Sequence, residues 1–155
     1  MKKKYYLAYG SNLNVSQMAW RCPGATAVGT ATLDGWQLAF RGSGSGVYLT
    51  IVPCEGASVP LGVWQITEAD ERSLDRYEGF PHFYYKQNMR VKVQNHLTGK
   101  RRSVDALIYI MREDRPFGFP DGSYVRTCAE GYRDFYLDLG PLLDAVRRAG
   151  EVVFA

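Results

Sequence analysis

The sequence is poor in the residues on which metal and nucleophilic enzymes depend. It holds two histidines and three cysteines in 155 residues. His82 and His96 fall in different predicted loops, and neither has a cysteine at the spacing of a zinc site. The cysteines stand far apart and form no C-x-x-C pair, so we expect no disulfide framework. We therefore expect no metal, no cofactor and a reducing, cytoplasmic environment.

Long apolar runs are also missing. The uncharged stretch from Gly42 to Cys54 is rich in Gly, Ser and Thr, and it is shorter than the roughly 18 apolar residues of a membrane span. The basic start is followed by Tyr5–Gly10 rather than by a long apolar segment with a cleavage site. These absences predict neither membrane insertion nor export.

An excess of charge of one sign is absent as well, because the formal net charge is only +3. Lys2–Lys4 and Lys100–Arg102 are short basic runs, of the kind usually found at solvated ends. A nucleic-acid-binding barrel would need Lys100–Arg102 to join a continuous basic face with exposed tyrosines. We expect no nucleic-acid partner.

The glycine-rich segment Gly42–Gly46 lacks the features of a phosphate-binding loop. Position 47 is Val where the dinucleotide fingerprint needs Gly, and the residues that follow predict a strand rather than a helix. We interpret the segment as a flexible loop between strands.

What remains is the composition of one folded domain, with 46% apolar and 14% aromatic residues. No Pro/Ser-rich linker divides the chain, so we expect a single domain over residues 1–155. The strand-like runs predict six or seven strands in an α+β fold that is mostly antiparallel or barrel-like. These runs are Tyr5–Tyr9, Ala27–Thr32, Trp36–Phe40, Val47–Val52, Val59–Ile66, Tyr84–Gln94 and Ser103–Met111.

Turn signals separate these runs. Asp34-Gly35 predicts a hairpin turn, and Pro53–Ser58 predicts a break between two further strands. Residues 95–100 predict the turn of a later hairpin.

Helix signals lie between and after the strands. Asn12 or Asn14 is predicted to cap a short helix that ends at Cys22-Pro23-Gly24. Thr67 and Asp70 predict a capping box, which opens a helix with Leu74 and Tyr77 facing inward and Glu78 as its last residue. Two more helices are predicted over residues 123–137 and 141–149.

Two segments are candidates for chemistry. In Tyr9–Leu13 a predicted strand turns into a helix, and a Gly-containing turn of this kind exposes backbone N–H groups that can bind anions. The alternative is that Gly10 only permits the turn and Asn12 only caps the helix. At Glu78, burial and the helix C-terminus would both raise the carboxyl pKa toward the range useful for proton transfer. The alternative there is an exposed glutamate at a helix end.

Taken in order, these segments resemble the γ-glutamylcyclotransferase-like family, which includes the AIG2-like proteins. The pentapeptide Y-G-S-N-L followed far downstream by E-G is the most specific part of the resemblance. The matching segments are Tyr9–Leu13, Gly62-Val63-Trp64, Leu74–Gly79, Tyr84-Tyr85-Lys86 and Pro120–Tyr124.

The resemblance implies a small mixed β-barrel with helices packed around it. It implies that Glu78 is the catalytic carboxylate and that a short loop binds the substrate. The implied substrate-binding residues are Tyr9, Gly10, Ser11, Asn12, Leu13 and, by a weaker match, Tyr124. For Tyr124 the alternative is a half-buried tyrosine at the start of a helix.

The reaction that the resemblance implies is cyclisation of a γ-glutamyl group to 5-oxoproline, with release of an amine from a small-molecule γ-glutamyl substrate. It needs neither an enzymic nucleophile nor a metal. The turn would hold either the substrate α-carboxylate or the oxyanion. A second hypothesis is a non-catalytic module of the same fold that only binds a γ-glutamyl ligand. If the site is correct, Glu78 should lie within roughly 4–8 Å of the Gly10–Asn12 backbone.

Overall fold

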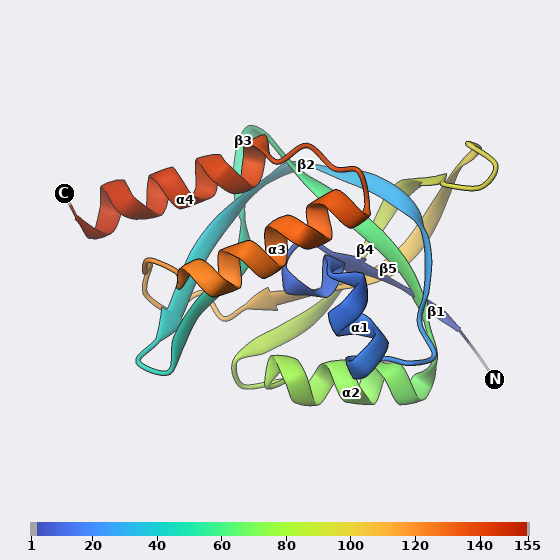
Figure 1. Ribbon diagram of the computed structural model, residues 1–155, viewed down its shortest axis with the longest axis horizontal. Helices are drawn as coiled ribbons and strands as arrows, with labels where there is room; N and C mark the ends of the chain where they lie inside the picture. Colours follow the sequence, from blue (N-terminus) through green and yellow to red (C-terminus); the bar gives the residue numbers. More distant parts are fainter. Residues whose placement is uncertain (1–2, 155) are drawn as a thin grey trace.

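The centre of the molecule is a closed five-stranded barrel with the strand order β1-β3-β2-β4-β5 (Figure 1). The computed structural model describes residues 3–154. All neighbouring strands are antiparallel except β1 and β5, which pair in parallel. The predicted α+β class, with a mixed and mostly antiparallel barrel, is therefore confirmed. The strands are β1 (Lys4–Ala8), β2 (Thr26–Ser43), β3 (Gly46–Ile66), β4 (Tyr84–Asn95) and β5 (Arg101–Met111).

The predicted number of strands was wrong, because β2 and β3 are each continuous where the sequence predicts a break. Asp34-Gly35 forms no hairpin turn: the register with β3 shifts between Asp34 and Trp36, and Gly35 adopts φ 83°. Between these two residues, the single residue Gly35 of β2 faces residues 54–57 of β3, so the extra residues of the bulge lie on β3. Glycine permits the positive φ on the β2 side. Residues 53–58 likewise lie within β3. The turn between the two strands falls instead at Gly44-Ser45, inside the segment predicted to be a loop between strands.

The helices begin close to the predicted places, although α3 ends three residues before its predicted end and α4 ends four residues after it. The Asn14 side chain accepts a hydrogen bond from Gln17 N and so caps α1 (Val15–Arg21). Both halves of the capping box of Thr67 and Asp70 are present at the start of α2 (Glu68–Glu78). The remaining helices are the short 3-10 helix η1 (Ser11–Leu13), α3 (Gly122–Asp134) and α4 (Gly140–Val153).

The helices pack around the barrel and hold the first turn in place. Helix α3 contacts η1, and α4 lies over β2 (Figure 1). Gly131 of α3 allows a close approach, because a Cβ there would lie 2.6 Å from Asn14 N. The Tyr132 hydroxyl donates to Tyr9 O at 2.9 Å, and Trp64 Nε1 donates to Asn12 O at 2.9 Å. The turn after β1 is thus fixed from both the barrel and α3.

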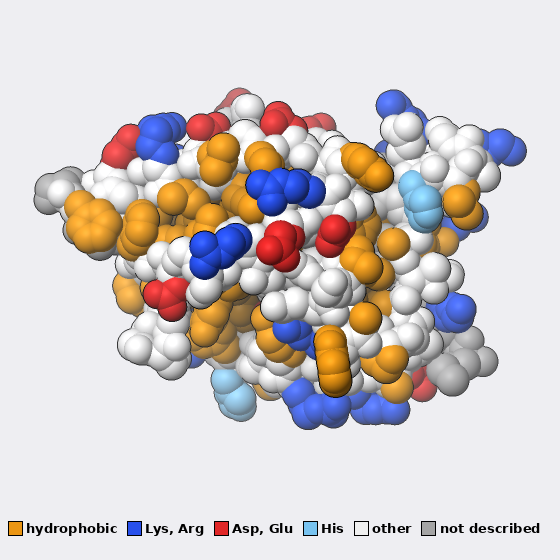
Figure 2. All heavy atoms as spheres, viewed as in Figure 1, with side chains coloured by type: hydrophobic (Ala, Val, Ile, Leu, Met, Phe, Trp, Pro, Cys, Tyr) orange, Lys and Arg blue, Asp and Glu red, His pale blue; other side chains and the backbone are white. Residues whose placement is uncertain are grey.

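Helix α4 leaves part of its apolar surface exposed. Leu143 and Val152 are more than half exposed, and Phe119 packs edge-to-face on Phe154 with ring centres 5.2 Å apart. Figure 2 shows apolar side chains at the end of the molecule where α4 finishes. None of the helices in the described part of the chain has the length and apolarity needed to cross a membrane.

Candidate active site

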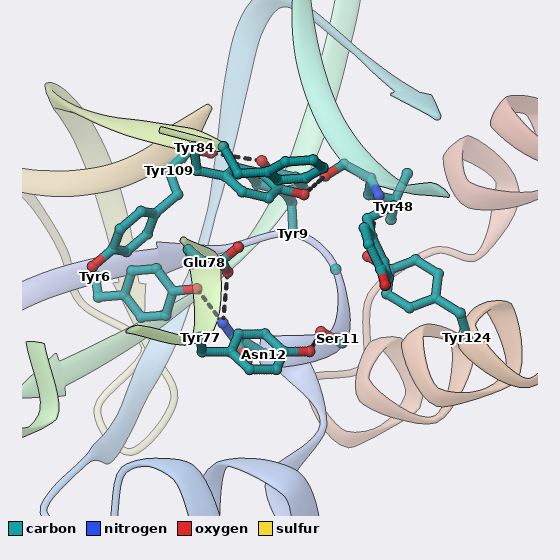
Figure 3. Close-up of a pocket in the computed structure, with 13 residues that line it drawn as sticks. Tyr6, Tyr9, Ser11, Asn12, Tyr48, Tyr77, Glu78, Tyr84, Tyr109 and Tyr124 are labelled. Carbon is teal, nitrogen blue, oxygen red and sulfur yellow. Dashed lines mark hydrogen bonds between the residues drawn. The ribbon is translucent and has the colours of Figure 1, made fainter. Parts of the chain in front are cut away.

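A cavity of about 170 Å³ lies where β1 turns into η1 and where α2 ends (Figure 3). Tyrosines predominate in its lining, and Glu78 is its one charged residue. The lining residues are Tyr6, Tyr9, Gly10, Ser11, Asn12, Tyr48, Leu49, Tyr77, Glu78, Phe83, Tyr84, Tyr109 and Tyr124.

Gly10 is required at the turn by the space around it. A Cβ at this position would lie 3.2 Å from the Tyr124 hydroxyl oxygen and 3.5 Å from Leu49 Cδ1. The absence of a side chain therefore keeps this part of the pocket open.

Asn12 joins the turn to the carboxylate. Its Nδ2 donates to Glu78 Oε1 at 3.2 Å and to the Tyr6 hydroxyl at 2.8 Å (Figure 3). Arg21 Nη1 donates to Asn12 Oδ1. A guanidinium can only donate, so it fixes which end of the amide faces Glu78. The structure therefore brings together the two halves of the site predicted from the sequence.

Arg21 is itself held in place on two sides. Its guanidinium carbon lies 3.4 Å from the centre of the Tyr77 ring, and its Nη2 donates to Gln17 Oε1 at 3.0 Å. The Tyr77 hydroxyl lies 3.1 Å from Ser11 Oγ. Helix α1, the turn and the end of α2 are thus linked around one cation.

Glu78 is partly buried at the last position of α2, and this burial raises the pKa of its carboxyl to about 8. The positive charge of Arg21 and the hydrogen bond from Asn12 both act in the opposite direction. Burial, which is one of the two causes expected from the sequence, is the largest influence on this pKa. A carboxyl with this pKa can both accept and return a proton near neutral pH.

The tyrosine hydroxyls around Glu78 differ in whether their proton is already donated to a backbone carbonyl. Tyr9 donates to Tyr109 O at 2.6 Å, and Tyr84 donates to Leu49 O at 2.7 Å. Tyr124 instead accepts from Leu49 N at 3.1 Å. Its own proton points to the sulfur of Cys128, which is a weak acceptor, so a stronger acceptor on a ligand can take its place. Burial raises the pKa of Tyr9, Tyr84 and Tyr124 well above the ordinary value, which keeps these hydroxyls neutral.

Six of the seven site residues predicted from the sequence line this pocket. They are Tyr9, Gly10, Ser11, Asn12, Glu78 and Tyr124. Leu13 does not: it is fully buried, and a Cβ on Gly62 would lie 2.4 Å from Leu13 Cδ2. We therefore assign Leu13 to the core rather than to substrate binding. Within residues 3–154, no group of three or more His, Cys, Asp or Glu side chains could hold a metal ion.

Several residues of the site were not predicted. Tyr77 was expected to face inward, but it is 46% exposed and lies at the pocket rim. Arg21 lies in the predicted short helix that ends at Cys22, but no sequence signal assigns it to the site. The other unpredicted lining residues are Tyr6, Tyr48, Leu49, Phe83, Tyr84 and Tyr109. The sequence feature that could have pointed to these lining residues is the abundance of tyrosine. The chain has 11 tyrosines, and many of them lie in predicted strands.

Solved structures with this fold include two that are named as γ-glutamyl cyclotransferases. A γ-glutamyl cyclotransferase superposes with a TM-score of 0.77 at 24% identity, covering 93% of this chain and 86% of the other. The human uncharacterized protein LOC79017 superposes with a TM-score of 0.76 at 26% identity, covering 94% and 87%. A yeast γ-glutamyl cyclotransferase specific to glutathione gives 0.58 at 15% identity, covering 96% and 97%. No curated protein sequence matches this chain.

Residues 6–126 match the family described as γ-glutamyl cyclotransferase, AIG2-like. The matched region spans most of the chain and contains the turn, Glu78 and Tyr124. It also includes every other residue that lines the pocket. This chain therefore belongs to the γ-glutamyl cyclotransferase, AIG2-like family.

Proposed function

We propose that the protein is a γ-glutamyl cyclotransferase, which converts the γ-glutamyl group of a small amide into 5-oxoproline and releases the free amine. The observation that carries the proposal is the contact of Glu78 with Asn12 inside a pocket that holds no other charged residue. A proton-transfer group and a turn suited to anions then face the same small cavity.

In this reaction the substrate supplies its own nucleophile. The α-amine attacks the γ-carbonyl carbon, a five-membered ring forms, and the bond between that carbon and the leaving nitrogen breaks. The protein has to hold the chain in a folded conformation, remove a proton from the α-ammonium, stabilise the oxyanion and protonate the leaving nitrogen.

Glu78 is the residue suited to both proton transfers. As a carboxylate it accepts a proton from the α-ammonium, and as a carboxylic acid it returns a proton to the departing nitrogen. A pKa of about 8 in the free protein makes it a stronger base than an ordinary glutamate. An α-ammonium bound beside it favours the ionised carboxylate, so binding primes the first step.

The turn and Tyr124 together supply donors for a negative oxygen. Backbone N–H groups at the start of η1 have no partner within that helix. The Tyr124 hydroxyl comes close to the same turn, since a Cβ on Gly10 would lie 3.2 Å from it. These donors suit the oxyanion of the tetrahedral intermediate or the substrate α-carboxylate.

The size of the cavity suits the glutamyl part of a substrate. An engineered cavity of about 150 Å³ in another protein holds a benzene molecule, and this one has about 170 Å³. The enclosed part therefore accommodates the glutamyl group, while the leaving amine extends toward the rim. The second hypothesis, a module that binds without turnover, would not require a carboxyl of raised pKa in contact with the turn.

We extend the proposal to a single cytoplasmic domain that acts on a small molecule without a nucleic-acid partner. Cys22, Cys54 and Cys128 are all unpaired, which is usual in a reducing compartment.

The test is to incubate the protein with γ-glutamyl amino acids, a γ-glutamyl peptide and γ-glutamyl amines, and to measure 5-oxoproline. Formation of 5-oxoproline together with the free amine from at least one of them is expected. Tight binding of these compounds with no 5-oxoproline from any would instead support the binding module.

A further inference from the structure

Two arginines, Arg41 and Arg115, lie beside aromatic residues of the pocket wall. Tyr48 and Phe83 form part of its wall and are only partly buried, which places them toward the rim. The Arg115 guanidinium carbon lies 4.6 Å from the centre of the Phe83 ring. Arg41 is the register partner of Tyr48 across β2 and β3. Directly opposed residues of antiparallel strands project from the same face of a sheet, so Arg41 stands beside Tyr48.

The loop after β5 brings the two arginines to one place. Phe117 forms an isolated bridge with Arg41, whose guanidinium carbon lies 4.3 Å from the Phe117 ring centre. Arg115 lies two residues earlier in the same loop. Tyr48 also packs edge-to-face against Phe83, with ring centres 6.3 Å apart. The two cations therefore flank the same pair of rim aromatics.

Both guanidinium groups have N–H donors without a hydrogen-bond acceptor among residues 3–154. The Nε atoms of Arg41 and Arg115 are buried and have no hydrogen-bond partner. Within residues 3–154, neither arginine forms an ion pair; Arg41 Nη1 donates to Glu113 O, and the Arg115 side chain has no hydrogen bond. Buried N–H groups without an acceptor are rare and costly in native proteins. Arg41 Nη2 and both Nη atoms of Arg115 also have no acceptor among residues 3–154 and are not buried, so they are the donors that an anionic group of a ligand could reach.

The chemistry of the substrate places such a group at the rim. When the glutamyl part fills the enclosed cavity, the leaving amine lies toward the open side. An α-amino acid in that position carries a carboxylate two bonds from the leaving nitrogen, whereas a simple amine carries none. Arginine binds carboxylates through charged, often bidentate hydrogen bonds.

We infer that Arg41 and Arg115 form a carboxylate-binding subsite at the pocket rim, so that γ-glutamyl amino acids are better substrates than γ-glutamyl derivatives of uncharged amines. The inference rests on the proposed function and specifies its substrate class. Neither arginine takes part in the chemical step; the pair selects the leaving group.

The experiment compares γ-glutamyl-alanine with γ-glutamyl-alaninamide, which differ only in the carboxylate. We would measure kcat/KM for 5-oxoproline formation with the unaltered protein, with Arg41→Met, with Arg115→Met and with the double variant. The control is Arg90→Met, which removes an exposed arginine that pairs with Asp105 on the β4–β5 hairpin.

The unaltered protein and Arg90→Met should prefer the carboxylate substrate by about 10- to 100-fold, the range for hydrogen bonds to charged groups. The double variant should lose this preference while retaining its rate with the alaninamide, which also shows that it is folded. If the double variant does not fold, the single variants should each show a reduced preference.

Equal kcat/KM for the two substrates in the unaltered protein would overturn the subsite and leave the proposed function intact. A preference that persists in the arginine variants would overturn it as well. Absence of 5-oxoproline from both substrates, and from every compound of the wider panel, would instead overturn the proposed function itself, and the subsite with it.

Discussion

The Asn12 side chain is held at both of its polar ends. Arg21 donates to its oxygen, and its nitrogen donates to both Glu78 and Tyr6. A free amide could turn over and present its oxygen to the carboxylate, which would be repulsive. Arg21 does not line the pocket itself, but it positions the donor that faces Glu78, and its charge lowers the pKa of the carboxyl that burial raises.

Replacing Arg21 should consequently change the pH dependence of the reaction. In Arg21→Met the pKa of Glu78 should rise further above about 8, because the nearby positive charge is gone. The rising limb of kcat/KM against pH should then move to higher pH, and the rate at pH 7 should fall about tenfold.

The pH profile of 5-oxoproline formation checks this, with Arg21→Lys expected to keep part of the effect of the charge. A profile with an unmoved midpoint in Arg21→Met would show that the residue acts only by packing on Tyr77.

At the scale of single elements, the turn between β1 and η1 leaves no room for a side chain at Gly10. Gly10→Val should fill the space next to Tyr124 and Leu49 and obstruct ligand binding. Because the atoms nearest to the added Cβ belong to the side chains of Tyr124 and Leu49 rather than to the backbone, they can shift and the fold should survive. We expect KM to rise at least tenfold, with a fall of no more than a few degrees in thermal midpoint.

The matched control is Gly44→Val, in the β2–β3 turn, where a Cβ would meet nothing within 4 Å. Gly44→Val should leave both the KM and the thermal midpoint unchanged. Substrate affinity that is equal in Gly10→Val and Gly44→Val would show that the turn is only structural.

A second element, α3, depends on a close approach to the same turn. A Cβ on Gly131 would lie 2.6 Å from Asn14 N and from Leu13 C, which are backbone atoms that cannot move aside. Gly131→Ala should therefore destabilise the protein by roughly 1–3 kcal/mol despite the better helix propensity of alanine. Urea unfolding of this variant measures the change, and an increase in stability would contradict the packing described here.

The starts of the helices could be predicted from the sequence, whereas the continuity of β2 and β3 could not. The capping box of Thr67 and Asp70 depends on contacts within one turn, so local sequence is sufficient. Whether Asp34-Gly35 turns the chain back or lies within a continuous strand depends on the partner strand, and β3 pairs with both sides of it. A local signal cannot decide between these outcomes.

The site, too, could be predicted only in part. The turn and Glu78 are contiguous segments with distinct chemistry, and a family resemblance pointed to both. Tyr6, Tyr84 and Tyr109 come from three different strands. Only closure of the barrel brings them to one pocket, and no spacing within the sequence encodes that closure.

At the scale of the whole molecule, the barrel closes at a short parallel seam. β1 and β5 share only the pairs Tyr5 with Ala106 and Tyr6 with Leu107. Beside this seam, Lys4 and Lys86 both bind Glu71 of α2, at 2.9 and 2.8 Å. The charged cluster links β1, α2 and β4, in addition to the backbone pairing.

The free energy of unfolding should depend on pH through the titration of Glu78. Its carboxyl has a pKa of about 8 when folded and near 4.5 when unfolded. Between these values the folded state keeps a proton that the unfolded state has lost, so this contribution is complete below pH 4.5 and is lost as pH rises through about 8. The loss is on the order of a few kcal/mol, or roughly 10 °C in thermal midpoint.

Thermal midpoints of the unaltered protein and of Glu78→Gln, measured from pH 5 to pH 9, check this expectation. The difference should favour Glu78→Gln increasingly as pH rises, because a neutral amide has no charge to desolvate. Parallel curves for the two proteins would mean that Glu78 titrates alike in the folded and unfolded states.

The central claim is that Glu78 moves the proton in cyclisation, and turnover by Glu78→Gln tests it most directly. The amide is nearly isosteric but cannot accept and return a proton. With the best γ-glutamyl substrate, measured alongside substrate binding and thermal midpoint at pH 7, we predict a rate of 5-oxoproline formation at least 10²–10⁴-fold lower, with binding and fold retained. Turnover within a few-fold of the unaltered protein, in a variant that is folded and binds substrate, would contradict the account.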